Sequence, residues 1–72
     1  MKNIKKIKIK LNGKIKYINI DYKLSELLKL HKIPLKKVAI ELNEEIIDKK
    51  KISKINLKKN DKIEIVHFIG GG

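Results

Sequence analysis

The sequence predicts a single α+β domain in which a mixed sheet of four to five strands packs on one helix. Apolar residues alternate with lysine over residues 7–11, as in a strand with one buried face. They recur at helical spacing over residues 24–31. Alternation returns over residues 62–69, so the domain is expected to end with a strand.

The first two strands are predicted to form a hairpin. Residues 7–11 place their apolar side chains on one strand face and lysines on the other. Asn12-Gly13 follows, the preferred pair for a two-residue type I′ turn, because both positions adopt positive φ. The second strand is expected over residues 14–21. Its apolar residues change parity between Tyr17 and Ile18, which indicates a bulge or a strong twist.

An amphipathic helix is expected from about residue 23. Its apolar stripe consists of Leu24, Leu27, Leu28 and His31. Asp21 is the expected N-terminal cap, and Glu26 suits the positive end of the helix dipole. Pro34 excludes helix from residue 33 onward.

The second half of the chain is predicted to complete the sheet. Residues 38–42 form a strand, residues 43–45 a turn and residues 46–47 a short strand. Residues 48–59 are a polar loop with one helical turn, before the last strand at 62–69. The loop is anchored by Ile52, Ile55 and Leu57. This order fits a ubiquitin-like β-grasp with a central last strand, and another α+β topology fits it as well.

The charge of the chain is strongly positive. All 19 basic residues are lysine and only eight residues are acidic, so the net charge is +11. This charge favours nucleic acid or acidic proteins as partners. The chain is also rich in Ile and Asn, which share A/T-rich codons with Lys, so codon bias is the favoured explanation. A small basic nucleic-acid-binding protein stays as the alternative of another class, although such a protein uses Arg and several aromatics.

The sequence lacks the residues that several kinds of chemistry require. There is no cysteine, so no disulfide framework or zinc finger is expected. No apolar run approaches the roughly 20 residues of a membrane span, and no signal-peptide pattern is present. His31 and His67 have no second ligand at metal spacing, and Glu44 and Glu45 are adjacent in a turn. We therefore expect a cytoplasmic protein without a metal site or catalytic constellation, not an enzyme.

Gly70, Gly71 and Gly72 follow the last strand, so we expect a domain at residues 1–69 and a flexible tail at 70–72. Three glycines carry an entropic cost that calls for a reason. Without Cβ atoms, an extended tail can enter a narrow channel and bring its carboxylate to a nucleotide on another protein. Adenylation would activate that carboxylate, and a sulfur donor could convert it to a thiocarboxylate. Because the chain has no cysteine, any sulfur that it carries must be on the C-terminal carbon.

The ending at residues 61–72 resembles the C-terminus of the ThiS family, the sulfur carriers of thiamine biosynthesis. Residues 38–47 and 24–28 resemble the middle strand and the helix of that family. The resemblance implies a β-grasp fold and no bound cofactor. It also implies that a ThiF-type enzyme uses ATP to adenylate Gly72. A persulfide donor then supplies sulfur, and the thiocarboxylate passes it to a ThiG-type thiazole synthase.

The resemblance also assigns roles near the tail. Gly70 and Gly71 would thread into the partner. Independently of the resemblance, Phe68 is expected either in the core or against a partner, because it lies close to the tail and interfaces favour exposed aromatics. Small subunits of molybdopterin synthase share the fold and diglycine, but usually reach it through a proline-containing segment that is absent here. The thiamine pathway is therefore favoured, with molybdopterin carriers and ubiquitin-like modifiers as alternatives. The lysine-rich surface predicts an acidic docking face on the adenylating partner.

Overall fold

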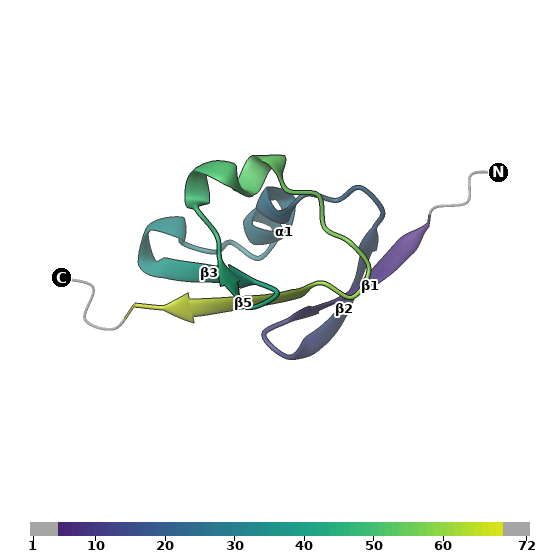
Figure 1. Cartoon of the computed structure of the whole chain (residues 1–72), viewed down its shortest axis with the longest axis horizontal. Coiled ribbons are helices and arrows are strands. Elements are labelled where there is room, and N and C mark those ends of the chain that lie inside the picture. Colours follow the sequence, from purple (N-terminus) through teal and green to yellow (C-terminus); the bar gives the residue numbers. More distant parts are fainter. Residues whose placement is uncertain (1–4, 69–72) are drawn as a thin grey trace.

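The computed structural model describes residues 5–68 and has the predicted α+β architecture (Figure 1). Helix α1 packs across one face of a five-stranded mixed sheet. The strands are β1 (Lys6–Leu11), β2 (Lys14–Asn19), β3 (Val38–Leu42), β4 (Glu45–Ile46) and β5 (Lys62–His67). The helices are α1 (Leu24–Leu30) and the 3₁₀ helices η1 (Leu35–Lys37) and η2 (Lys49–Lys54).

The strand order is β2-β1-β5-β3-β4. β5 is parallel to β1 and antiparallel to β3, so the last strand occupies the centre of the sheet. This arrangement confirms the β-grasp and rules out the other α+β topology. The expected boundary between domain and tail, at residues 69 and 70, lies outside the described residues.

Both hairpin turns are two residues long and have positive φ at each position. Asn12 and Gly13 have φ values of 50° and 81°, which confirms the predicted type I′ turn. Asn43 and Glu44 turn the chain in the same way, with φ values of 53° and 72°. Glu45 was expected in this turn but already belongs to β4, because it pairs with β3. The short strand is therefore one residue earlier than predicted.

Of the bulge or strong twist predicted in the second strand, the bulge is wrong. The register between β1 and β2 is uninterrupted along all six residues of each strand. Ile18 faces the core, whereas Ile15 and Tyr17 lie on the opposite face with 53% and 65% of their surfaces exposed. The change of parity thus reflects apolar residues on both faces of the sheet. β2 also ends at Asn19, earlier than predicted.

Helix α1 begins one residue later than predicted and uses a different cap. Lys23 occupies the N-cap position, and its backbone N–H donates to Glu26 Oε1 at 2.9 Å. Glu26 therefore completes one half of a capping box, besides lying in the first turn. The prediction of Asp21 as cap is wrong, because this residue is in a left-handed turn with φ 70° before the helix.

The end of α1 is a Schellman motif followed by proline. Lys32 adopts φ 55°, and the Ile33 N–H donates to the Leu28 carbonyl at 3.0 Å. Pro34 comes next, so α-helix is excluded where the sequence predicted. The short 3₁₀ helix η1 that follows was not predicted.

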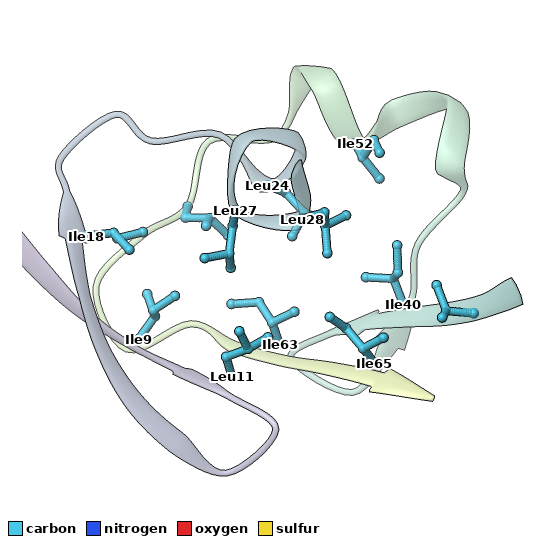
Figure 2. Close-up of a cluster of buried hydrophobic side chains, with 12 residues drawn as sticks. Ile9, Leu11, Ile18, Leu24, Leu27, Leu28, Ile40, Ile52, Ile63 and Ile65 are labelled. Atoms are coloured by element: carbon cyan, nitrogen blue, oxygen red, sulfur yellow. The ribbon is translucent and has the colours of Figure 1, made fainter. Parts of the chain in front are cut away.

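The core lies between α1 and the inner face of the sheet, with η2 closing one side (Figure 2). Each buried Ile or Leu stabilises the fold by about 1.5–3 kcal/mol relative to exposure. The segment at residues 48–59, predicted as a polar loop with one helical turn, contains a longer helix than expected, because η2 spans six residues. Its anchors are as predicted: Ile52 and Leu57 are buried, and Ile55 is half-buried. The core consists of Ile9, Leu11, Ile18, Leu24, Leu27, Leu28, Val38, Ile40, Ile52, Leu57, Ile63 and Ile65.

Candidate carrier site at the end of β5

β5 carries the chain from the centre of the sheet toward the glycines, and its backbone bonds alternate between two neighbours. Its even-numbered residues bond toward β3: the Lys62 carbonyl accepts from the Asn43 N–H at 2.8 Å. At the far end, the Phe68 N–H donates to the Lys37 carbonyl at 2.9 Å. The odd-numbered residues face β1, where the Ile63 carbonyl accepts from the Asn12 N–H at 2.9 Å.

Three polar side chains from turns hold the first half of β5. Asn12 Oδ1 accepts from the Ile65 N–H at 2.7 Å, which continues the bonding on the β1 side after β1 has ended. Asn43 Oδ1 accepts from the Lys62 N–H at 2.9 Å, and its Nδ2 donates to Asp61 Oδ1 at 2.9 Å. These bonds fix both flanks of the strand.

Asp61 is the buried member of this network. Only 9% of its surface is exposed, and its second carboxylate oxygen accepts from the Lys58 N–H at 2.7 Å. A buried carboxylate is tolerated because its oxygens are hydrogen-bonded. Sequence reasoning assigned Asn12 and Asn43 to turns but missed these side-chain bonds. Asx residues at turns were the available signal, since their side chains often bond to nearby backbone.

The last two residues of β5 and Phe68, which follows the strand, are exposed. Val66 and Phe68 have 51% and 53% of their surfaces accessible, although both are apolar. The Phe68 ring is not part of the core, and Lys49 Nζ lies 5.4 Å from its centroid. That distance permits a cation–π contact. Of the two positions considered for Phe68, the core is thus excluded, while contact with a partner stays a prediction.

The residues expected to carry the chemistry, Gly70, Gly71 and Gly72, lie outside the described residues. Their predicted roles as the threading tail and attachment point therefore stay predictions. The structure describes the strand that leads to them. β5 is anchored in its first half and presents exposed apolar side chains in its second half.

The other candidate residues form no site. His31 was expected on the apolar stripe of α1 but is exposed just after the helix, and His67 is also exposed. Within residues 5–68, no cluster of His, Cys, Asp or Glu could hold a metal ion. Glu44 forms an ion pair with Lys62 at 3.2 Å, at the surface. The lysine run at residues 49–51, expected in a solvated loop, begins η2.

The described part of the chain contains no helix of the length and apolar character that crossing a membrane requires.

Comparison with known proteins gives consistent matches. The model of the ThiS family matches residues 7–72. The sulfur carrier protein ThiS of Bacillus subtilis is 40% identical over 65 residues, which cover 89% of this chain and 98% of that protein. A thiazole synthase of Paramagnetospirillum magneticum is 35% identical over 66 residues, which cover 92% of this chain but 20% of that protein.

A solved structure agrees with these sequence matches. The crystal structure of the thiamine biosynthesis protein ThiS from Geobacter metallireducens superposes with a TM-score of 0.78 at 28% identity. The superposition covers 92% of this chain and all of that chain. The molybdopterin, modifier and nucleic-acid alternatives are therefore set aside. The chain belongs to the ThiS family and is a non-catalytic sulfur carrier of thiamine biosynthesis.

Proposed function

We propose that Gly72 is the residue on which this carrier holds sulfur. Its carboxylate attacks the α-phosphate of ATP on a ThiF-type enzyme, which forms an acyl-adenylate and releases pyrophosphate. A persulfide sulfur then displaces AMP, and a thiol reduces the resulting S–S bond to leave a thiocarboxylate. The observation that carries this proposal is the extent of the family match, which includes all three glycines.

Within this proposal, residues 1–69 are the domain that the partner grips and residues 70–72 are the tail that it threads. Gly70 and Gly71 let the tail pass through a channel too narrow for side chains. The carrier binds no cofactor of its own, and ATP is consumed by the adenylating enzyme. Because the exchange uses ATP, we place it in the cytoplasm.

The acceptor of the sulfur is proposed to be a ThiG-type thiazole synthase. The support is the thiazole synthase of Paramagnetospirillum magneticum, in which a segment similar to this chain makes up 20% of one polypeptide. Joining carrier and synthase in one chain raises their effective concentration, which is useful only if they act together.

The exposed end of β5 is proposed to be a contact for the partner. Phe68 is half exposed, carries an aromatic ring and lies two residues before the glycines. Exposed aromatics are enriched among residues that dominate binding. We expect Phe68→Ala to weaken binding to the adenylating enzyme at least fivefold, which corresponds to about 1 kcal/mol. Tyr17→Ala is the matched control, since it removes an exposed aromatic from β2.

The proposal is tested by the intact mass of the protein after incubation with ATP, a persulfide donor, a reducing thiol and the ThiF-type enzyme. We expect a gain equal to the exchange of one oxygen for one sulfur in the full chain. The same mixture should leave a chain lacking Gly72 unchanged. If the full chain gains no mass while the enzyme activates another known carrier, Gly72 is not the attachment point.

A further inference from the structure

The strand that leads to the tail has an open edge. The odd-numbered residues of β5 direct their backbone groups toward β1, but β1 ends at Leu11. The Asn12 N–H donates to the Ile63 carbonyl, and Asn12 Oδ1 accepts from the Ile65 N–H. Beyond that point β5 continues past the β1–β2 hairpin (Figure 1). Among residues 5–68, no hydrogen bond is made by the Ile65 carbonyl or by the N–H of His67 on this side.

A hollow lies next to this open edge. Its volume is about 310 Å³, and Asn12 and Ile65 belong to its wall. The apolar part of the wall is formed by Leu11, Ile33 and Ile65. Its polar side chains include Lys14, Lys16 and His31. Among residues 5–68, no carboxylate lines the hollow, so Lys14 and Lys16 make the electrostatic potential of this lining positive at neutral pH.

We propose that the open edge and the hollow together bind an extended acidic segment of the adenylating enzyme, which adds as a strand beside β5. This inference rests on the proposed function. Main-chain bonds to Ile65 and His67 would supply affinity, as in other cases of strand addition. An apolar side chain of the added strand would fill the hollow, and its acidic neighbours would face Lys14 and Lys16.

The charge of the chain argues for a partner over a second copy. At +11, two copies repel each other, and the lysines beside the open edge would meet in a symmetric pair. An acidic segment has the complementary charge. Strand addition would also hold the end of β5 extended while the glycines enter the partner. The ordering of a glycine tail is costly, so a fixed starting point improves binding.

Amide hydrogen exchange on the complex is the direct test. We expect the His67 N–H to exchange at least tenfold more slowly when the adenylating enzyme is bound. The exchange rate of the Ile65 N–H is the internal reference, because this N–H already donates to Asn12 Oδ1 in the free protein. An unchanged His67 rate in a saturated complex overturns the proposal.

A pair of variants tests the same bond by affinity. His67→Pro removes an N–H that faces away from β3, and its ring also fixes φ, whereas His67→Ala keeps the N–H. A comparison of the two folded variants therefore tests the backbone bond. We expect His67→Pro to bind the enzyme about three- to tenfold more weakly than His67→Ala. Melting curves establish whether the proline variant is folded, and equal affinities of two folded variants contradict strand addition.

Charge reversal tests the acidic nature of the segment without touching the backbone. The double variant Lys14→Glu/Lys16→Glu should bind about tenfold more weakly at low salt, with a smaller loss at high salt. Lys50→Glu/Lys59→Glu makes the same charge change away from the hollow and should bind nearly as the wild type does. If both double variants lose the same affinity, the effect of charge is not local to the hollow, and no acidic segment binds there.

The mass measurement separates this proposal from the proposed function. If the wild-type chain forms the thiocarboxylate but its His67 amide is unaffected by the enzyme, only strand addition fails. If the wild-type chain forms no thiocarboxylate and no complex with an active enzyme, the proposed function fails first.

Discussion

The two halves of β5 are built differently. The first half is bonded on both flanks, with side chains of Asn12 and Asn43 joining the backbone bonds, and its apolar residues are buried. The second half bonds to β3 on one flank, and the exposed apolar residues are Val66 and, directly after the strand, Phe68. The first residues of β5 therefore anchor the strand in the sheet, whereas its end is exposed and available for contact with a partner.

The difference explains how a small domain can hold a tail for another protein. A chain of this size has a limited core, so it cannot lose many contacts when a partner pulls on its end. Anchoring the strand near Asp61 and Ile63 keeps a pull on the exposed end from disrupting the core. Substitutions in the first half should therefore affect stability, and those in the second half should affect binding.

The largest expected effect on stability comes from substitution of Ile63, the buried residue in the first half of β5. Ile63 is fully buried at the centre of the sheet, and Ile63→Ala should lower the free energy of unfolding by about 2–5 kcal/mol. Val66→Ala, three residues later on the exposed half, should change it by less than about 0.5 kcal/mol. Urea denaturation of both variants measures the difference. Similar losses would mean that the two halves are equally part of the core.

Asp61→Ala should have the next largest effect. It leaves the Lys58 N–H and the Asn43 amide without their partner, in a site that is largely buried. We expect a loss of about 2 kcal/mol in the free energy of unfolding. The control is Glu45→Ala on β4, an exposed carboxylate whose removal should cost under about 0.5 kcal/mol. A loss for Asp61→Ala no greater than the control's would contradict the anchoring role.

Asn12→Gly isolates one side-chain bond at the point where the two halves meet. Glycine keeps the positive φ of the turn but cannot accept from the Ile65 N–H. The expected loss is about 1 kcal/mol in thermal or chemical unfolding. In the same variant the Ile65 amide should exchange faster, which extends the open edge by one residue. An unchanged Ile65 rate would show that the bond does not protect this amide.

The elements that were predicted correctly from the sequence are those specified by patterns of a few neighbouring residues. Alternation and Asn12-Gly13 specify the first hairpin, and Pro34 marks the end of α1, because these signals act within a few residues. The bulge was wrong because Ile15 and Tyr17 are apolar yet lie on the exposed face. A hydrophobic pattern cannot tell which face a helix will cover.

The anchor of β5 depends on contacts that no local pattern contains. Asn12 and the Ile65 amide are 53 residues apart in the sequence, and Asn43 and Asp61 are 18 apart. Each pair is brought together by the fold of the sheet and not by closeness in the sequence. The open edge at His67 likewise follows from where β1 ends beside β5. The role of the three glycines stays a prediction from the resemblance to the ThiS family, because they lie outside the described residues.

Amide hydrogen exchange in the free protein tests the contrast within β5 most directly. The Ile65 N–H donates to Asn12 Oδ1, whereas no bond is made by the His67 N–H among residues 5–68. The account predicts slow exchange at Ile65 and at least tenfold faster exchange at His67 under native conditions. Equal protection of these two amides would contradict it, because β5 would then be closed on both flanks along its whole length.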